Sequence, residues 1–387
     1  MPEAVIVDAV RTPIGRAFKG SLAQVRPDET GAFAIDQLLE RNPDVDPALV
    51  EEVIAGCGMP QGKQAFNVGR IMALLSERLP LETNGSTVSR YCASGLEAIR
   101  IASNNIKAGQ GDAYVAAGIE FVSQFNERTE AAGAADQNEN LQGGEGHHDV
   151  YIQMGDTAVN VAKRYDVKRE DMDQYAQRSQ ELAVQSQESG FFDREIVPVT
   201  LPDGTVVSKD DGPRASSSLE KLASLPEAFE GGGGVTAGNS CPLNDGAAAA
   251  LIMSDTKAKE LGLTPRARII TAATAANEPE YMGVAPIWAI GKVLERAGMT
   301  IADVDTVELN EAFAAQVIPI MAECDIPLEK MNPHGGAIAL GHPFGMTGVR
   351  IMTTLLNGLE ADDKTIGLET MCVAGGQGEA MIVERLK

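Results

Sequence analysis

The sequence predicts an α/β fold built from two similar halves, with a subdomain inserted into the first half. Short apolar segments alternate with amphipathic helical segments, the order of segments in residues 1–121 returns in residues 264–387, and a polar stretch between them follows neither pattern. Such alternation is typical of a mainly parallel sheet covered by helices on both faces. We therefore expect a duplicated α/β unit.

The first half is expected to alternate strands and helices up to residue 121. Its elements in chain order are the strand EAVIVDAV, a helix near Glu29 to Leu39, the strand VEEVIAGC, a helix near Val68 to Leu75, a β-branched run ending before Cys92, a helix after Cys92, and the strand DAYVAAGIE. The helix after Cys92 is predicted because Leu96, Ile99, Ser103 and Ile106 recur at helical spacing.

The second half repeats this order. Its elements are the strand ARIITAATAA, a helix near Ile287 to Ala297, the strand VDTVELNE, a helix near Ala315 to Glu323, a Gly-rich turn with a helix near Thr347 to Gly358, and the strands TIGLETMCV and GEAMIVERL. VEEVIAGC corresponds to VDTVELNE, and the helix after Cys92 corresponds to the helix after GHPFGMTG.

The stretch between the halves is polar and rich in Gly and Gln, with one long helix expected from about Glu170 to Ser189. A structureless loop of that length is improbable in a compact domain. We expect residues 122–244 to form an inserted domain, residues 1–121 and 245–263 to form the first half, and residues 264–387 to form the second.

Composition excludes several classes of protein. The formal charge of −23 disfavours nucleic acid and anionic membranes, and no apolar run reaches the roughly 18 residues needed to span a bilayer. The five cysteines of a 387-residue chain that enters a strand at once, without a signal segment, argue against a disulfide framework. We expect a cytoplasmic protein without membrane insertion.

Cys92 is the first candidate for chemistry because it falls at or just before a helix N-terminus. Unpaired N–H groups and the positive end of the helix dipole favour a thiolate there. An inert buried thiol is the alternative, since free cysteine is among the most buried residue types. Cys57, which ends a strand, and Cys324, which ends a helix, are expected to be packed thiols.

Three further segments place polar groups at the ends of strands or in Gly-rich turns. Cys372 ends a strand before a Gly-rich turn, and Asn310 and Glu311 end another strand. A thiol nucleophile needs a base, and His342 in NPHGGAIALGHPFGMTG is the best of the four histidines, ahead of His334 and the adjacent pair His147 and His148. A Cys/His metal site is the competing interpretation, but no CxxC, HxxxH or HExxH spacing supports it.

Taken together, TVSRYCASGLEAI, NEAFA, GGAIALGHPFGMTGVR and MCVAGGQGEA, in this order, resemble the thiolases, the acetyl-CoA acyltransferase family. VRTPIGRAFKGSL near the start and GPRASSSLEKLASLPEAF with TAGNSCPLNDGAAAA in the middle extend the resemblance over the whole chain. It implies a five-layered αβαβα fold of two βαβαβαββ halves, each with five strands, and a loop domain inserted in the first.

The resemblance also implies roles for the candidate residues. Cys92 takes the acyl group as a thioester, His342 deprotonates it, and Cys372 is the second acid/base. The backbone amides of Cys92 and of the Cys372 turn, at Ala374 and Gly375, supply one oxyanion hole, and His342 with a water held by Asn310 supplies the other.

The resemblance places coenzyme A on the inserted domain, as a substrate rather than a permanently bound cofactor, and implies no metal. The residues expected at the substrate and CoA are Arg214 near the adenine, Ala237 and Cys241 along the pantetheine arm, and Met154, Ala312 and Phe313 at the acyl pocket.

Four positions depart from the usual family pattern. Asn is common where Ser89 and His334 stand, Ser where Cys241 stands, and Gly where Ala374 stands. The Ala374 amide is an expected oxyanion donor, and its Cβ is tolerable only if φ stays negative.

The expected activity is that of a 3-ketoacyl-CoA thiolase, which cleaves 3-ketoacyl-CoA with CoA to acetyl-CoA and a shortened acyl-CoA. Gln153 before Met154 and the ending MCVAGGQGEAMIVERL favour this over an acetoacetyl-CoA thiolase, the alternative. A ketoacyl synthase uses two histidines, so Cys372 speaks against it. An inactive lipid-binding or scaffold protein on this fold is the non-enzyme alternative. The family implies a homodimer or homotetramer, with or without a β-oxidation partner subunit.

Overall fold

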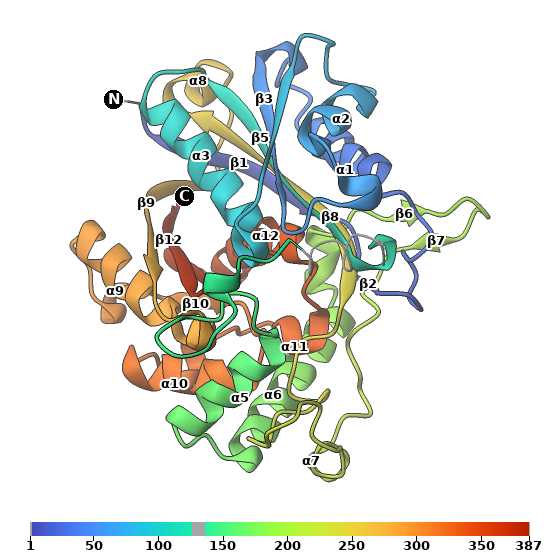
Figure 1. Ribbon diagram of the computed structural model, residues 1–387. Coiled ribbons are helices and arrows are strands. Elements are labelled where there is room, and N and C mark those ends of the chain that lie inside the picture. The colour runs from blue at the N-terminus through green and yellow to red at the C-terminus, as the bar shows by residue number, and fades with distance from the viewer. Residues whose placement is uncertain (1, 126–135, 387) are drawn as a thin grey trace.

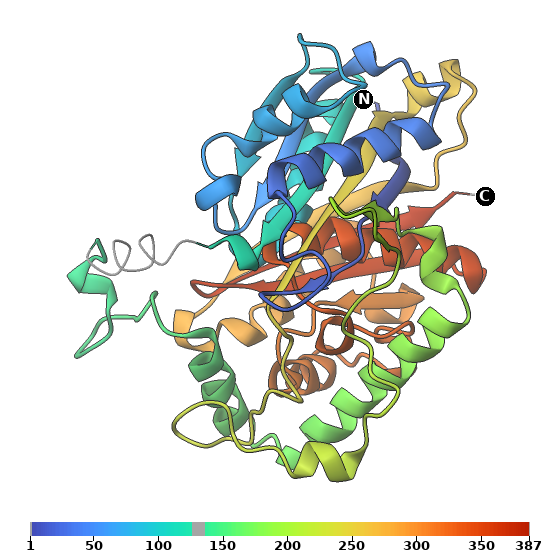
Figure 2. The same ribbon diagram turned by 90° about the vertical axis from the view of Figure 1, so that its right-hand side faces the viewer.

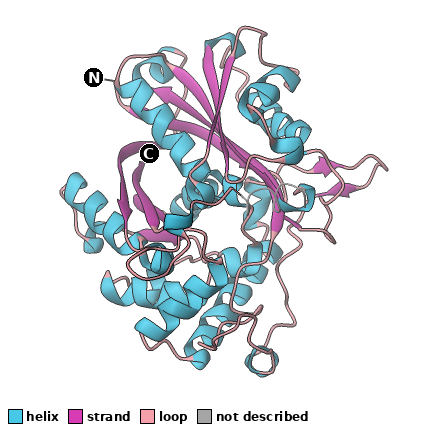
Figure 3. Ribbon diagram, viewed as in Figure 1, coloured by secondary structure: helices cyan, strands magenta, loops and turns pink. Residues whose placement is uncertain are grey.

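A computed structural model describes residues 2–125 and 136–386, and in it two sheet halves join edge to edge (Figures 1 and 3). The strands are β1 Ala4–Arg11, β2 Gly15–Arg16, β3 Val50–Cys57, β4 Asn84–Val88, β5 Ala113–Phe121, β6 Val199–Thr200, β7 Val206–Val207, β8 Asn244–Ser254, β9 Ala267–Ala276, β10 Thr306–Leu309, β11 Ile366–Val373 and β12 Gln377–Arg385.

The predicted helices are found close to their expected positions. The helices of the described residues are α1 Pro27–Arg41, α2 Val68–Leu75, α3 Ser94–Lys107, α5 Met154–Arg164, α6 Arg169–Glu188, α7 Leu219–Ala223, α8 Asp255–Glu260, α9 Pro286–Ala297, α10 Ala314–Glu323, α11 Ala337–Leu340 and α12 Phe344–Ala361. Of these, α5, α7, α8 and α11 were not predicted. The helix α12 begins three residues earlier than expected and continues three residues further.

The main sheet has the order β10-β11-β12-β9-β1-β8-β5-β3-β4, with β2 beside β8. Each half uses the same order of equivalent strands, and the halves meet where Val5 of β1 pairs with Arg268 of β9. Four strands form the second half in the described chain, and an isolated bridge between Val307 and Met331 stands where the first half has β4. The expected duplication is therefore present, with its fifth strand reduced to that bridge.

The expectation of a mainly parallel sheet is wrong, because the sheet is mixed. β3 runs parallel to β4 and β5, and β10 runs parallel to β11, whereas the other neighbouring pairs are antiparallel. A short turn, such as the three residues between β11 and β12, can join only antiparallel neighbours. Alternation of strands and helices does not reveal this direction.

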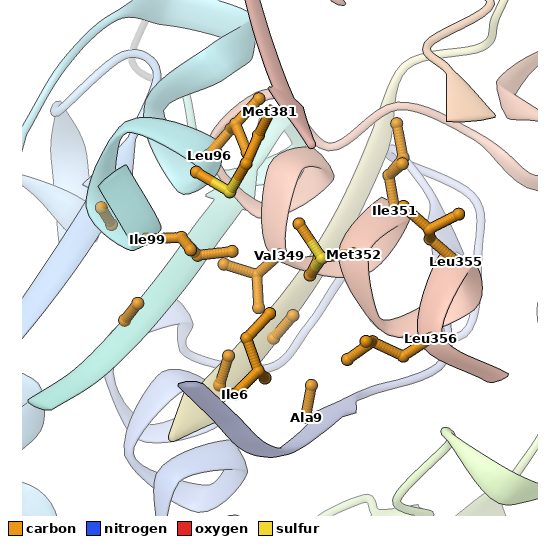
Figure 4. Close-up of a cluster of buried hydrophobic side chains, with 14 of the residues drawn as sticks. Ile6, Ala9, Leu96, Ile99, Val349, Ile351, Met352, Leu355, Leu356 and Met381 are labelled. Carbon is orange, nitrogen blue, oxygen red and sulfur yellow. The ribbon is translucent and has the colours of Figure 1, made fainter. Parts of the chain in front are cut away.

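The layers follow from the buried faces. The helices α3 and α12 pack against each other between the two sheet halves, α1 and α2 lie on the outer face of the first half, and α9 and α10 lie on the outer side of the second (Figures 1 and 2). The central core is completely buried because both helices and both sheets supply apolar side chains, among them Ile6, Leu96, Ile99, Val349 and Met352 (Figure 4). This is the expected five-layered arrangement.

The stretch between β5 and β8 carries α5, α6, α7 and the β6–β7 hairpin, so the expectation of one helix there was incomplete. The short helix α5 is amphipathic, with a buried face made of Gly155, Thr157, Ala158, Val159, Val161 and Ala162, so its apolar periodicity could have been found in the sequence. Arg11 of β1 ties the stretch down, since its guanidinium bonds Asp210 at 2.7 and 2.9 Å and Glu195 at 2.6 Å, all fully or almost fully buried. Across the described residues, no helix is both long and apolar enough to cross a membrane.

Candidate active site

Cys92 lies where the sequence predicts it, immediately before the central helix α3. After β4 the chain makes a 3₁₀ turn over Tyr91–Ala93, and α3 begins at Ser94. The Ser94 hydroxyl accepts from the Arg90 N–H at 2.9 Å and donates to the Tyr91 carbonyl at 2.6 Å, which fixes the turn. Cys92 is buried, with 8% of its surface exposed.

Glycines bring the start of α12, which follows His342, against the start of α3. A Cβ at Gly95 would lie 2.7 Å from the carbonyl oxygen of Gly345, and a Cβ at Gly348 would overlap the backbone nitrogen of Leu96. Only glycine permits this approach of two backbones. The Cys92 turn and the GHP turn, which come from different halves of the chain, are therefore held together.

The buried carboxylate of Glu120, near the end of β5, joins the GHP turn to the segment that follows β3. It accepts from the Gly58 N–H at 2.7 Å, from the Gly345 N–H at 2.9 Å and from the Gln64 side chain. Burial raises the pKa of Glu120 to about 7, although these donors oppose the shift.

His342 is buried with both ring nitrogens engaged. Its Nδ1 lies 2.7 Å from Thr347 Oγ1, and that hydroxyl donates its proton to the Pro343 carbonyl at 2.8 Å. The hydroxyl must therefore accept from Nδ1–H, which leaves Nε2 without a proton. Nε2 accepts from Asn310 Nδ2 at 3.2 Å. Burial, helped by the charge of Arg350, lowers the His342 pKa to about 3, so the ring is a neutral base.

Asn310 directly follows β10, as the sequence predicts. Its backbone N–H donates to the Thr370 carbonyl at 3.0 Å, which places it beside β11. Its buried Oδ1 has no hydrogen-bond partner within the described part of the chain. A buried amide oxygen of this kind is suited to accept from a bound water or substrate group.

Two side chains that sequence reasoning missed hold the His342 turn. The His342 N–H donates to Asn244 Oδ1 at 3.0 Å, and Asn244 Nδ2 donates to the Gly15 carbonyl at 3.0 Å. Thr347 fixes the ring, as described above. Asn244 begins a buried strand and Thr347 lies in the first turn of a helix, so both resemble ordinary structural residues in the sequence.

Cys372 lies near the end of β11, fully buried, and Gln316 Nε2 donates to its sulfur at 3.1 Å. Burial raises the Cys372 pKa to about 11, and the bond from Gln316 opposes that shift. Gln316 was not predicted as a site residue, since only its position two residues after NEAFA marks it in the sequence.

The turn after Cys372 reaches the other thiol. The Ala374 N–H lies close enough to the sulfur of Cys92 to favour its thiolate, which brings the ends of the two halves together. Gly375 and Gly376 have φ of 79° and 75°, whereas Ala374 avoids positive φ. The condition set for a Cβ at residue 374 is therefore met.

The expectation that the helix lowers the pKa of Cys92 is wrong. Burial raises this pKa well above its ordinary value, and the neighbouring sulfurs of Cys372 and Cys241 add to the effect. Only the Ala374 N–H acts in the opposite direction among the leading causes. The helix start cannot offset the loss of water around a buried thiolate, so Cys92 needs a base to ionise.

A pocket of about 540 Å³ lies mainly on the inserted stretch, and Cys92, Cys372, His342 and Asn310 are not on its wall. Arg214, Ala237 and Cys241 lie on its wall, together with the cations of Arg16 and Lys221. Of these wall residues, Cys241 is the link to the thiols, because it interacts electrostatically with Cys92 and Cys372. Cations at the mouth suit a phosphorylated ligand.

Met154, Ala312 and Phe313 do not lie on the wall of this pocket. Met154 begins α5, while Ala312 and Phe313 are buried just before α10. The Ala312 carbonyl accepts from the Cys241 N–H at 2.9 Å, and Phe313 packs edge-on against Phe229 of the pocket wall. They support the pocket from behind.

The other histidines lie in different surroundings. His334 stacks on Phe191 with ring centroids 3.7 Å apart, and His147 and His148 are exposed. Of the packed thiols, Cys57 is fully buried and Cys324 is half-buried. No cluster of three or more potential metal-ligating His, Cys, Asp or Glu side chains occurs in residues 2–125 and 136–386.

Glu311 connects the site to the inserted stretch. Its carboxylate accepts from the Tyr175 hydroxyl at 2.8 Å, the Ser179 hydroxyl at 2.6 Å, Asn332 Nδ2 at 2.8 Å and the Ile338 N–H at 3.1 Å. Tyr175 and Ser179 belong to α6, so this one buried carboxylate holds α6 against the second half.

Comparison with known proteins agrees with this arrangement. Residues 4–256 match the thiolase N-terminal domain and residues 263–385 match the thiolase C-terminal domain. The chain is 43% identical to the β-ketoadipyl-CoA thiolase of Acinetobacter baylyi over 100% of both chains, and 39% identical to the 3-ketoacyl-CoA thiolase of Bacillus subtilis over 99% of this chain and 100% of that one.

Solved structures show the same fold. The dimeric peroxisomal thiolase of Saccharomyces cerevisiae superimposes with a TM-score of 0.92 at 37% identity, covering 100% of this chain and 98% of that one. The acetyl-CoA acetyltransferase of Bacillus anthracis gives 0.91 at 38% identity, covering 100% and 99%. Family matches over both halves and this likeness over the whole length establish that the chain belongs to the thiolase family.

Proposed function

We propose that this protein is a 3-ketoacyl-CoA thiolase that works through an acyl-thioester on Cys92. The observation that carries the proposal is that two buried thiols, Cys92 and Cys372, interact across the halves, while glycine contacts bring the turn of His342 against the turn of Cys92. The His342 ring is neutral and its Nε2 lacks a proton. Two thiols and one base suit a reaction that first transfers an acyl group to sulfur and then moves a proton to carbon.

In the first step, His342 Nε2 takes the proton of the Cys92 thiol, and the thiolate attacks the C3 carbonyl of the substrate. Collapse of the tetrahedral intermediate breaks the C2–C3 bond and leaves the electron pair on the enolate of acetyl-CoA. The thiol of Cys372 then donates its proton to C2, and acetyl-CoA departs.

In the second step, the thiol of a new CoA attacks the acyl group on Cys92 as its proton passes to the Cys372 thiolate. The thioester bond to Cys92 breaks, and its sulfur is expelled as a thiolate that recovers a proton from His342. The acyl-CoA then leaves the enzyme. Both cysteines and the histidine then return to their starting protonation states, in a ping-pong sequence.

Developing negative charge needs donors fixed in advance. We assign the backbone amides of Cys92, Ala374 and Gly375 to one oxyanion, and His342 with a water held by Asn310 to the other. In support, the Ala374 N–H favours the thiolate of Cys92, and the Oδ1 of Asn310, which has no partner in the described residues, offers an acceptor for that water.

CoA is proposed to lie in the pocket of the inserted domain, residues 122–244, between the halves formed by residues 1–121 with 245–263 and by residues 264–387. Arg214 at the mouth takes the phosphorylated end, and Ala237 and Cys241 flank the arm. We assign Met154, Ala312 and Phe313, which do not line this pocket, to the part of the site that holds the acyl chain of the substrate. That the enzyme works without a bound metal stays a prediction.

We also propose a homo-oligomer, a dimer at least. β4 is an edge strand of the sheet, and exposed large apolar side chains gather near it at Phe66, Leu74, Leu75 and Leu81. An unpaired edge beside apolar surface favours association with a second copy. A yeast relative is described as dimeric. The five thiols, all free, suit a reducing compartment such as the cytoplasm.

Thiolytic cleavage tests the proposal directly. Loss of 3-ketoacyl-CoA enolate absorbance with CoA present is followed for acetoacetyl-CoA, a medium- and long-chain series, and 3-oxoadipyl-CoA, which the names of relatives suggest. Cys92→Ala is the control. Activity with longer chains supports the proposal, activity confined to acetoacetyl-CoA identifies the short-chain alternative, and none above the control indicates an inactive binding or scaffold protein.

A further inference from the structure

Gln316 has a contact that the mechanism above does not use. Its side chain is fully buried in the first turn of α10, with Nε2 3.1 Å and Oε1 3.5 Å from the sulfur of Cys372. Within the described residues, Cys372 is the one hydrogen-bond partner found for this amide. Removing a primary amide from water costs free energy unless its bonds are replaced.

A thiol replaces those bonds poorly as long as it is protonated, because sulfur is a weak acceptor and S–H a weak donor. A thiolate is a far better acceptor, since a hydrogen bond to a charged group is roughly twice as strong as a neutral one. The contact between Gln316 and Cys372 therefore gains strength when Cys372 ionises. The position of Gln316 in the first turn of a helix adds the positive end of the helix dipole.

The neighbouring backbone leaves room for this amide. A Cβ at Gly283 would lie 3.0 Å from Gln316 Cβ and 3.3 Å from its Oε1, so a glycine at 283 lets the side chain take its position. Gln316 is absent from the wall of the CoA pocket. Its surroundings therefore direct it at Cys372 and away from the bound ligand.

Resting on the proposed function, we infer that Gln316 is a positioning residue for Cys372. Its Nε2 donates to the Cys372 thiolate, and its Oε1 accepts from the Cys372 thiol, as the proton moves to and from carbon. The same amide then serves both protonation states without a rearrangement of the backbone. Loss of it slows the step in which Cys372 exchanges a proton with the substrate and leaves CoA binding unchanged.

The test compares Gln316→Met, which keeps an unbranched side chain of similar volume, with the unaltered enzyme. Iodoacetamide labelling is followed by peptide mass spectrometry at one pH between about 8 and 9. There the labelling rate of each cysteine is proportional to the fraction of it that is a thiolate. Cys372 is expected to label about tenfold more slowly in the variant, and Cys92 in the same sample at its former rate. In turnover, kcat falls about tenfold and KM for CoA is unchanged.

Gly283→Ala is the second variant, because it keeps the amide and crowds it. A smaller slowing of Cys372 labelling in the same direction is expected. Ile320→Val, a buried change in the same helix, is the matched control and should label and turn over as the unaltered enzyme does. Thermal unfolding of every variant confirms that it is folded.

Labelling of Cys372 at the unaltered rate in Gln316→Met overturns the inference, even if kcat falls, because the loss would then be structural. An unaltered enzyme that lacks thiolytic activity, but whose Cys372 labelling depends on Gln316, would sink the proposed function and leave the Gln316–Cys372 relationship standing. The two failures are thus distinguishable.

Discussion

Thr347 Oγ1 lies 2.7 Å from His342 Nδ1, and it donates in turn to the Pro343 carbonyl, so one hydroxyl fixes which imidazole nitrogen carries the proton. A residue five positions along the chain therefore sets which nitrogen lacks a proton and can act as the base. Thr347 thus orients the imidazole and fixes its tautomer, as a carboxylate does in other histidine-dependent enzymes, without adding a charge to a buried site.

Replacing Thr347 by Val removes this restraint. We expect kcat/KM for thiolysis to fall roughly ten- to a hundredfold, because a misplaced proton on the ring removes general-base catalysis. Thr347→Ser should keep most of the activity. Thr353→Val is the matched control, since Thr353 makes the same bond to a carbonyl one turn back, to Val349 at 2.7 Å, in the same helix. An equal loss in the control would refute the assignment.

The pH dependence of catalysis should lack an acid limb near the ordinary pKa of histidine. Burial lowers the His342 pKa from 6.5 to about 3, so the ring stays a base throughout the range in which the enzyme is folded. The kcat/KM profile should therefore show no midpoint between pH 5 and 7, as an approximate window set by that shift. A clear midpoint near pH 6.5 that disappears in Thr347→Val would contradict this.

The same shift predicts how stability depends on pH. The unfolded chain binds a proton at His342 below 6.5 and the folded chain binds it only near 3, so this stabilising contribution is complete above 6.5 and is lost as pH falls toward 3. Urea unfolding of His342→Asn should therefore give a shallower loss between those values, by up to about 1.4 kcal/mol per pH unit. Parallel curves for the two proteins would show that His342 is not buried as a neutral ring.

Glu311→Gln should loosen the inserted stretch. The new amide replaces one acceptor oxygen by a donor, which faces either Tyr175 and Asn332, the donors to Oε1, or Ser179 and the Ile338 backbone, the donors to Oε2. We expect a loss of about 2–4 kcal/mol of unfolding free energy in urea.

KM for CoA should rise as well in Glu311→Gln, since Gln180 of α6 and Ile338 lie on the pocket wall. Glu323→Gln, an exposed change in α10, is the control and should alter neither quantity. Unchanged stability in Glu311→Gln would mean that α6 is held by its other contacts, such as the bonds from Arg178 to the Leu328 and Met331 carbonyls.

Arg214→Ala should raise KM for CoA about tenfold with little change in kcat, because a cation at the mouth of the pocket binds the phosphates equally before and during the reaction. The effect should shrink as salt is added. Lys209→Ala removes a nearby exposed charge that is not on the pocket wall and should leave KM within twofold. A fall in kcat at constant KM would place Arg214 elsewhere in the mechanism.

Cys241→Ser should keep kcat within about twofold. Burial raises the Cys241 pKa to about 12, as it also raises those of Cys92 and Cys372, but the proposed mechanism moves no proton or acyl group through Cys241, so a serine hydroxyl can replace its thiol. Cys92→Ser and Cys372→Ser, measured beside it, should abolish thiolysis. Loss of activity in Cys241→Ser equal to that in Cys372→Ser would add a third thiol to the mechanism.

The sequence by itself determined the elements and the residues that carry chemistry. Apolar periodicity located α2, α3 and α9 within a residue or two, and the position of Cys92 before a helix followed from the spacing of Leu96 and Ile99. Cys372 and Asn310 stood out as polar groups at strand ends. These features are local, so a one-dimensional pattern contains them.

Only the tertiary structure decided the direction of the strands, the ionisation of the site and the residues that hold it. Strand direction depends on which neighbours pair, and pKa depends on how much water is excluded, so the expectations of a parallel sheet and a depressed Cys92 pKa were both wrong. Gln316, Thr347 and Asn244 act through contacts that only folding creates. A side chain that acts only through its tertiary contacts has no local pattern by which the sequence could identify it.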